Sequence, residues 1–281
     1  MTLLVRFMHK TNRNLIKRRI YKFLPQKIRF RLLSYFLPEI KPSLENVIFR
    51  TATSPEDYLA AFNLVYKVFL KTGYIQPSPT PFRLAPQHCN ATSRVFIGVH
   101  KKNGTERLIY SISIFPDSET GLPMDMVFKK ELDRLRAKGR FLVEAGHLAA
   151  EPSYKTNTMN LPMLGNKILH QYAYRNLNAD DIVIAIHPKY RWFYEELLLF
   201  EALGEVKEYA YANNNPAVAM RLDLRTVKKR YEKAYKKIEL NKNLYQFFFH
   251  LNSDSIDLPD GFLDVEIKML ENLKHMYGFG L

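Results

Sequence analysis

The chain has 281 residues, of which 47% are apolar and 13% aromatic, so it is long enough to bury one large core or two small ones. No apolar run approaches the roughly 20 residues that span a bilayer, and the first residues lack the pattern of a secretory signal, so we expect neither feature. A single cysteine, Cys89, excludes an intramolecular disulfide and a cysteine-based zinc cluster, which fits a reducing cytoplasm.

Positive charge is concentrated at the start of the chain. Residues 1–38 contain ten Lys and Arg and no acid, which is +10 of the formal net charge of +14. Apolar residues alternate with these charges, and Pro25 divides the segment into two short amphipathic helices. This pattern predicts an arm that binds an anionic membrane surface; packing on its own domain or on a partner subunit is the alternative. Nucleic acid is disfavoured, because Phe and Leu outnumber the small polar residues that contact phosphates.

Past Pro42, strand and helix patterns alternate. Ser54 and Pro55 begin a helix that stops at Gly73, and Asn103-Gly104 joins two strands in a hairpin. The predicted strands cover residues 46–51, 94–101, 107–115, 141–150, 181–186, 205–211 and 217–224. The remaining predicted helices cover residues 123–138, 161–177, 190–203, 226–249 and 265–276. This order predicts an α/β (α+β) fold with a mixed, mostly antiparallel seven-stranded sheet and helices on both faces.

Five motifs carry a family resemblance. They are LVYKVFLKTGYI (64–75), DSETGLPMD (117–125), ELDRLRAKGR (131–140), EAGHLAAE (144–151) and HPKYRWFYEELLLFEALG (187–204). In this order they resemble the FeeM-like N-acyl amino acid synthases, relatives of acyl-homoserine lactone synthases in the N-acetyltransferase superfamily. The resemblance covers residues 48–224 and implies an N-acetyltransferase (GNAT-type) fold. One departure is Leu199, before Phe200, where relatives often carry glycine.

The resemblance implies transfer of a long-chain fatty acyl group from acyl carrier protein to the α-amine of an amino acid. Enzymes that use acyl-CoA usually hold its pyrophosphate on a glycine-rich turn, and residues 152–160 (PSYKTNTMN) have no glycine. We therefore expect a carrier-protein thioester rather than acyl-CoA, and no bound cofactor or metal. Carrier proteins are acidic, so a basic docking surface fits, with candidates Lys228, Lys229, Arg230, Lys233, Lys236 and Lys237.

Three residues are candidates for catalysis. Glu144 lies on an apolar strand, where burial raises the pKa of a carboxyl toward that of a useful base. Its other possible roles are binding the incoming ammonium, fixing a loop, or pairing as a structural acid with Arg83 or Arg140. His147 joins Glu144 on one face if a bulge forms at Gly146, and is otherwise a structural histidine. Tyr194 matches the tyrosine that protonates the departing thiolate in related acetyltransferases; an ordinary core tyrosine is the alternative.

Other residues are candidates for substrate binding. His187, at the end of its strand, relays a proton or lines the pantetheine channel. Arg83 binds the substrate carboxylate or is a solvated loop arginine. An apolar slot for the acyl chain has these candidates, many of which are expected to be ordinary core: Tyr66, Phe69, Tyr74, Phe82, Met124 and Met126.

The predicted organisation has three parts: a basic amphipathic arm (1–42), a GNAT-type acyltransferase domain (43–224) and a C-terminal helical extension (225–281). The predicted enzyme works in the cytoplasm, peripherally on the inner face of the membrane. Two alternatives remain open: an acyl-homoserine lactone-like signal synthase that uses S-adenosylmethionine, and a non-catalytic adaptor that binds acyl carriers or membranes.

Overall fold

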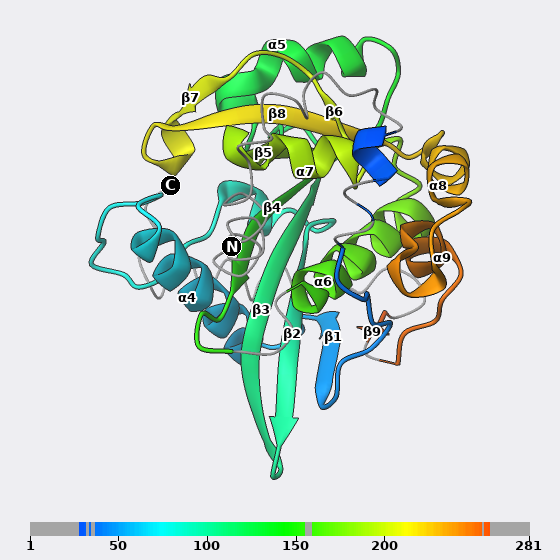
Figure 1. The fold of residues 1–281 in the computed structure, drawn as a ribbon. Helices are drawn as coiled ribbons and strands as arrows, with labels where there is room; N and C mark the ends of the chain where they lie inside the picture. Colours follow the sequence, from blue (N-terminus) through cyan, green and yellow to red (C-terminus); the bar gives the residue numbers. More distant parts are fainter. Residues whose placement is uncertain (1–27, 32–33, 35–36, 155–158, 255, 259–281) are drawn as a thin grey trace, which may run out of the picture.

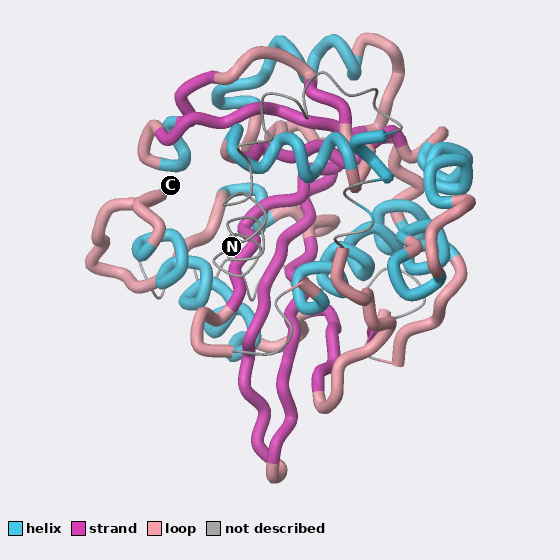
Figure 2. Tube along the Cα trace, in the orientation of Figure 1, coloured by secondary structure: helices cyan, strands magenta, loops and turns pink. Residues whose placement is uncertain are grey.

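The computed structural model describes residues 28–31, 34, 37–154, 159–254 and 256–258. In this part of the chain a single mixed sheet runs through the centre of the molecule, and helices cover both of its faces (Figures 1 and 2). The strands are β1 (Val47–Thr51), β2 (Arg94–Lys102), β3 (Thr105–Pro116), β4 (Leu142–Ala150), β5 (Asp181–Ile186), β6 (Glu201–Ala202), β7 (Lys207–Tyr209), β8 (Asn215–Asp223) and β9 (Ile256–Asp257). The α-helices are α4 (Pro55–Lys71), α5 (Asp125–Arg136), α6 (Asn160–Gln171), α7 (Arg191–Glu196), α8 (Val227–Tyr235) and α9 (Leu244–Phe249).

The strands follow the order β6-β8-β5-β4-β3-β2-β1-β9, and β7 also pairs with β8. The β4–β5 and β1–β9 pairs are parallel, and the other pairs are antiparallel. All seven predicted strands are present, and the short strands β6 and β9 were not predicted. The mixed, mostly antiparallel sheet expected from the sequence is therefore confirmed.

Local sequence signals determine where α4 begins and how β2 turns into β3. The Ser54 hydroxyl accepts a hydrogen bond from the Asp57 backbone N–H at 3.2 Å, so Ser54 is the predicted N-cap of α4. Between β2 and β3, Asn103 and Gly104 have φ values of 51° and 75°. Two consecutive residues with positive φ give the hairpin turn that matches the right-handed twist of the strands.

The two faces of the sheet carry different helices. Val95 and Ile97 of β2 pack in one cluster with Phe62 of α4, and we call this side the α4 face. Phe96 of β2 points the other way and packs with Leu164 of α6; this side is the α6 face. Helix α5 covers β5 and β8 on the α4 face, whereas α8 and α9 join the same core as α6.

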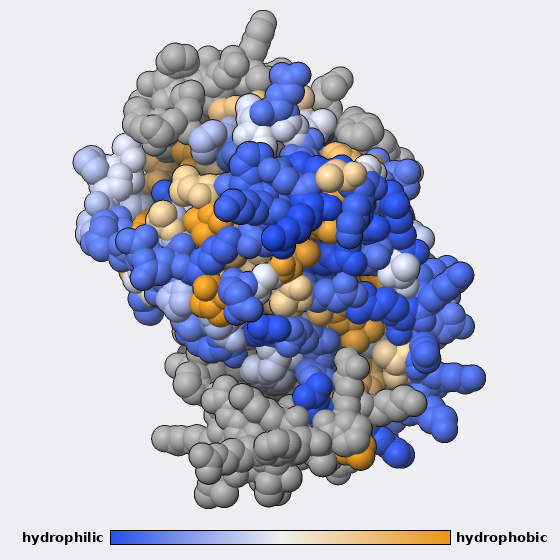
Figure 3. All heavy atoms as spheres, turned by 90° about the horizontal axis from the view of Figure 1, so that it is seen from above, coloured by the Kyte–Doolittle hydropathy of each residue, from blue (hydrophilic) through white to orange (hydrophobic). Residues whose placement is uncertain are grey.

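Hydrophobic side chains are mostly inside this arrangement. Seen from above, the described surface is largely hydrophilic, and its hydrophobic residues form small groups between hydrophilic ones (Figure 3). The apolar surface of the sheet is thus covered by helices from both sides, as expected for a layered α/β domain.

The predicted helix over residues 190–203 is wrong in its extent. Helix α7 ends at Glu196, and residues 201–202 form β6, which pairs with β8. Between them Leu199 has φ 55°, a left-handed conformation that reverses the chain and favours glycine. Phe200 therefore follows the turn instead of closing the helix. This is the position where the resemblance led us to expect glycine.

The predicted helix over residues 226–249 is two helices, α8 and α9. Asn243 stands at the break: its amide donates to the carbonyl oxygens of Tyr235 at 3.0 Å and Ile238 at 3.2 Å. The Asn243 side-chain oxygen accepts from the Gln246 N–H at 3.1 Å and begins α9. A side chain that caps one helix end and begins the next is a reason for the chain to turn here.

The two ends of the chain are described in part. Residues 1–27 and the predicted helix over 265–276 lie outside the described residues, so the membrane prediction for the arm stays a prediction. At the described end of the arm, Arg29 pairs with Glu196 at 2.9 Å and the Phe30 ring lies 4.9 Å from that of Tyr235. Helices in the described part of the chain include none long and apolar enough to cross a membrane. The predicted three-part division of the chain stays a prediction.

The parallel pair β4–β5 is short, and this positions the site. Its pairing covers Leu142–Glu144 of β4 and Asp181–Val183 of β5, and both strands continue beyond it. Past Glu144, β4 stays with β3, while β5 stays with β8. The two strands therefore separate, and a gap opens in the middle of the sheet.

Candidate functional site

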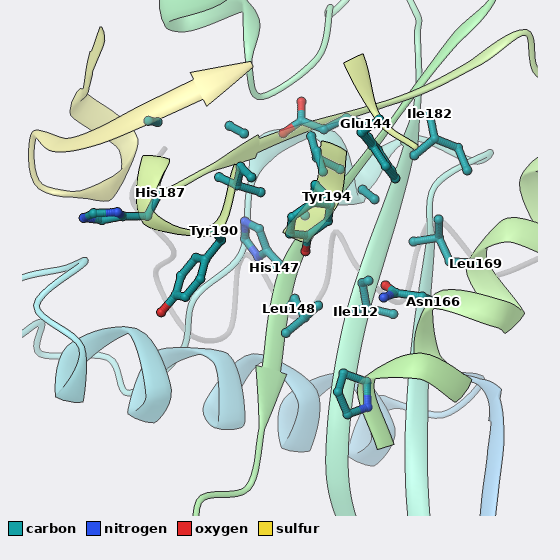
Figure 4. Close-up of a pocket in the computed structure, with 18 of the residues that line it drawn as sticks. Ile112, Glu144, His147, Leu148, Asn166, Leu169, Ile182, His187, Tyr190 and Tyr194 are labelled. Carbon is teal, nitrogen blue, oxygen red and sulfur yellow. The ribbon is translucent and has the colours of Figure 1, made fainter. Parts of the chain in front are cut away.

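A cavity of about 220 Å³ occupies the gap between β4 and β5. On the α4 face it is lined by Glu144, His147, His187 and Tyr211, among others. It passes between the strands to the α6 face, where its lining includes Ile112, Leu148, Asn166, Leu169, His170 and Ile184. Figure 4 shows His187 at one end of this space, Asn166 and Leu169 at the other, and His147 and Tyr194 between them.

Glu144 lies where the two strands part. Its side chain is buried, and its Oε2 accepts a hydrogen bond from the Met124 N–H at 2.8 Å. Burial raises the pKa of Glu144 well above its usual value, and the nearby Asp125 adds to this effect. The direction is the one expected from the sequence. A carboxyl whose pKa is raised in this way is a stronger base than an ordinary glutamate.

The two arginines considered as partners of Glu144 lie elsewhere. Arg140 pairs with Asp181 and, at 2.8 Å, with Asp223. Arg83 donates to the Tyr211 carbonyl at 3.0 Å. Among the described residues Glu144 forms no ion pair with either, so the interpretation of Glu144 as a structural acid paired with Arg83 or Arg140 is wrong.

A bulge in β4 brings His147 to the same face as Glu144. Gly146 pairs with Ser113 of β3 and Ala149 with Ser111, so His147 and Leu148 together face Ile112. His147 has φ 50°, and the extra residue lies there, one position after the expected Gly146. Its ring packs with those of Phe69 and Phe115 on the α4 face.

The His147 ring has two further aromatic neighbours. Its Nε2 lies 2.8 Å from the Tyr211 hydroxyl, and its ring centroid lies 4.8 Å from that of His88. Burial lowers the pKa of His147 well below 6.5, and the nearby His88 and Arg83 lower it further. The imidazole is therefore neutral at pH 7, with one nitrogen as donor and the other as acceptor.

Sequence reasoning missed His88 and Tyr211. His88 is buried, its Nδ1 accepts from the Ala85 N–H at 2.8 Å, and its Nε2 contacts Ser113 at 3.0 Å. Tyr211 sits in a short turn after β7, with the Arg83 guanidinium 4.1 Å above its ring. Both residues come from short turns, whose long-range contacts no periodic pattern reveals. The place of His88 within the short turn that begins at Pro86 was the one available signal.

Tyr194 lies on α7 and lines the cavity. Its ring packs edge-on against Phe193 and Phe200, at 5.6 and 5.4 Å between centroids. Burial raises the pKa of Tyr194 to about 12, so its hydroxyl keeps its proton at neutral pH. Within the described residues no hydrogen bond occupies this hydroxyl, and it can donate to a group that enters the cavity.

The other predicted binding residues divide into two groups. Phe69, Tyr74 and His187 line the cavity. His187 lies at its edge, where its Nδ1 accepts from the Lys189 N–H at 3.2 Å. Met124 reaches Glu144 through its backbone but packs its side chain in the α5 core.

The second group lies away from the cavity. The Tyr66 hydroxyl accepts from the Ser78 N–H at 3.1 Å, and Phe82 packs beside α4. The Met126 side chain is 64% exposed, so Met126 cannot line a buried slot. Arg83 supports Tyr211 instead of facing the cavity itself. The catalytic and binding roles assigned from the sequence stay predictions.

Comparisons with known proteins show which family this chain resembles in sequence and fold. A family model described as N-acyl amino acid synthase FeeM matches residues 60–223. The solved structure of FeeM, an N-acyl amino acid synthase from uncultured soil microbes, is 25% identical, with a TM-score of 0.58, over 65% of this chain and 93% of that chain. BjaI, a CoA-dependent acyl-homoserine lactone synthase solved with SAM and isopentyl-CoA, is 11% identical, with a TM-score of 0.50, over 80% of this chain and 98% of that chain. A search of curated proteins found no match.

The likeness to BjaI concerns the fold alone, and together with the FeeM structure it confirms the N-acetyltransferase-type fold predicted from the sequence. The family match runs from α4 to the end of β8, so it includes both strands that border the cavity. Because it spans more than half of the 281 residues, the chain belongs to the family of the N-acyl amino acid synthase FeeM and is an N-acyltransferase.

Proposed function

We propose that this enzyme transfers a long-chain fatty acyl group from an acyl carrier protein thioester to the α-amine of an amino acid. The observation that carries the proposal is the cavity that crosses the sheet between β4 and β5. It has ionisable groups on the α4 face and mainly apolar walls on the α6 face. An amine and an acyl chain can therefore approach one thioester carbonyl from opposite sides.

Glu144 is the proposed base. An amino acid arrives as an ammonium, and its nitrogen attacks the thioester carbonyl after losing a proton. A buried carboxylate with a raised pKa is suited to accept that proton. The neutral His147, on the same face of β4 and hydrogen-bonded to Tyr211, is the proposed second acceptor or orienting group for the amine.

The thioester carbonyl needs hydrogen-bond donors as negative charge develops on its oxygen. Beyond Glu144 the β4 backbone no longer pairs with β5, and Ala145, Gly146 and Leu148 line the cavity. Backbone N–H groups on this side of β4 are the proposed donors. Glu144 passes the first amine proton to solvent and then accepts the second, which the nitrogen loses after its attack. When the C–S bond breaks, the departing thiolate takes the proton of the Tyr194 hydroxyl, and Tyr194 regains a proton from solvent.

The acyl chain is proposed to lie on the α6 face. There the cavity runs between apolar side chains of the sheet and of α6, including Ile112, Leu169 and Ile184. Burying each methylene contributes about 0.8 kcal/mol, so such walls favour a long chain over an acetyl group.

A carrier protein is the proposed donor because α8 presents lysines to solvent. Lys228, Lys229, Lys233, Lys236 and Lys237 are exposed and can meet an acidic partner. Arg230 leaves this set, since it pairs with Glu201 at 2.8 Å and donates to the Leu199 carbonyl. The glycine-free turn at residues 152–160 points to the same donor; its residues 155–158 are outside the described part.

We also infer that the enzyme works at the inner face of the cytoplasmic membrane, held by its basic arm. A product with a fatty chain partitions into that membrane. Deleting residues 1–27 is expected to abolish co-sedimentation with vesicles that contain anionic lipid, while leaving acyl transfer in solution intact. Equal binding of the full and shortened chains to the vesicles would refute the membrane role of the arm.

Mass spectrometry of lipid extracts tests the central proposal. Cells that overproduce the chain are expected to contain a new N-acyl amino acid, which is absent with the Glu144→Gln variant at equal protein level. The mass of the product names the acceptor and the chain length. An acyl-homoserine lactone as the new compound, or no new lipid from a folded enzyme with carrier protein in excess, would overturn the proposal.

A further inference from the structure

The far end of the cavity holds a polar side chain that the proposed acyl transfer does not use. His170 lies on α6 and lines the cavity, with 6% of its surface exposed. Neither Nδ1 nor Nε2 has a hydrogen-bond partner among the described residues. The mechanism proposed above uses Glu144, His147 and Tyr194 but not His170, so His170 is a separate polar feature on the side assigned to the acyl chain.

The surroundings of His170 are aromatic. Its ring stacks on Tyr174 at 6.0 Å and meets Phe248 and Phe249 at 5.3 and 5.1 Å between centroids. Burial lowers the pKa of His170 to about 4, and Arg175 lowers it further, so the imidazole is neutral at pH 7. A neutral imidazole has one N–H donor and one nitrogen acceptor to satisfy.

A second polar side chain lies one helical turn away. Asn166 precedes His170 by four residues, so both occupy the same side of α6. Asn166 also lines the cavity, and Figure 4 shows its amide at the end occupied by α6. Its amide has no hydrogen bond to another described side chain or backbone group. Two adjacent polar groups without partners, at the end of an otherwise apolar slot, form a small hydrogen-bonding site.

We propose that His170 and Asn166 recognise a hydroxyl group on the acyl chain, so that the preferred donor is a hydroxylated fatty acyl thioester. A hydroxyl suits the site because it donates one hydrogen bond and accepts others, as the neutral imidazole and the amide require. A plain chain leaves the buried imidazole and the half-buried amide unpaired, which is unfavourable. A site built to bind a hydroxyl discriminates strongly against the analogue that lacks it. This inference names the substrate of the proposed acyl transfer and so rests on it.

Binding measured without an amino acid acceptor tests the inference, because no transfer takes place. The probes are acyl-pantetheine thioesters of the chain length that binds tightest. One probe has a plain acyl chain, and each of the others carries a single hydroxyl group at a different carbon. We expect one position, or two neighbouring ones, to lower the Kd about tenfold, which corresponds to about 1.4 kcal/mol. His170→Phe is expected to remove this preference and His170→Gln to keep part of it.

His100→Phe is the matched control, since His100 packs on Tyr154 away from the cavity, and its preference is expected to equal that of the wild type. If no hydroxyl position tightens binding, or if the preference survives in His170→Phe, the inference is refuted. The binding of the hydroxylated probes to the wild-type enzyme tests the inference even where a variant fails to fold. A hydroxyl preference without amide formation from any amino acid refutes the proposed function alone, whereas amide formation without a preference refutes this inference alone.

Discussion

Replacing Glu144 separates chemistry from structure, because two substitutions remove its charge but affect its hydrogen bond differently. In Glu144→Gln the side-chain oxygen can still accept from the Met124 N–H, which is buried in the native fold. In Glu144→Ala that N–H loses its partner, and a cavity is left. An unpaired buried donor costs about 1–3 kcal/mol, so we expect the Ala variant to be less stable than the Gln variant by about this amount.

Comparing Glu144→Gln with the wild type should also reveal a pH dependence of stability. The pKa of Glu144 is raised in the fold by burial, so the native state holds this proton more tightly than the unfolded chain does. The stabilisation is complete below the unfolded pKa of about 4.3 and is lost as the pH rises toward the folded pKa. Gln carries no such proton. The free energy of unfolding of Glu144→Gln, minus that of the wild type, should therefore increase from acid to neutral pH.

Urea unfolding at a series of pH values measures both effects, and single-turnover acyl transfer measures the chemistry. Loss of a general base lowers the rate by about 10²- to 10⁴-fold, and we expect this for both variants although Glu144→Gln is well folded. A Gln variant within tenfold of the wild-type rate would remove Glu144 from the mechanism. A stability difference that is flat with pH would refute a pKa of Glu144 raised by burial.

Three further changes test other contacts. Tyr194→Phe should slow acyl transfer by about 10²-fold. A thioester with a more acidic thiol should restore the rate, because its thiolate leaves without a proton. An equal loss of rate with both thioesters would contradict proton donation by Tyr194. Arg140→Gln leaves the fully buried Asp181 with only the more distant Arg221, at 3.6 Å, as an ion-pair partner. The loss of the charged hydrogen bonds should lower the free energy of unfolding by about 1.5–3 kcal/mol in urea titrations, so a loss below about 1 kcal/mol would count against a structural role for the Arg140–Asp181 pair. Gly165→Ala places a methyl group 2.2 Å from the Tyr110 ring. The overpacking costs about 1–3 kcal/mol and should exceed the gain of about 1 kcal/mol in helix propensity, so we expect a less stable protein. A raised urea midpoint would refute this reasoning.

Regular elements could be predicted from the sequence because their signals are local. The Ser54 cap, the Asn103-Gly104 turn and the alternation of buried residues each depend on a few neighbouring positions. The errors arise where a tertiary contact overrides such a pattern. The apolar run after Tyr190 reads as one helix, but β6 must reach β8, and Leu199 takes up a left-handed conformation to allow it.

The candidate site was predictable from the sequence only where its residues lie in regular elements. Glu144 was identifiable because an acid within an apolar strand is unusual, and the family resemblance marked its neighbourhood. Tyr211 and His88 reach the cavity from segments far apart in the chain, and their contacts with His147 depend on how loops fold over the sheet. Arg83 illustrates the same limit, since its guanidinium donates to the carbonyl of Tyr211, 128 residues away, a contact that no local pattern predicts.

The bulge at His147 links these features physically. Without it, residues 144 and 147 would point to opposite faces of β4, because side chains alternate along a strand. The extra residue reverses this alternation, so that His147 joins Glu144 on the α4 face while Ala150 packs on the α6 face. A bulge also bends its strand and increases the local twist, which moves β4 away from β5 just beyond their last pair at Glu144. The left-handed backbone of His147 is unfavourable by itself, and its contacts with Tyr211 and His88 help to offset that strain. One irregular residue thus both opens the cavity and brings a second ionisable group to the face of the proposed base.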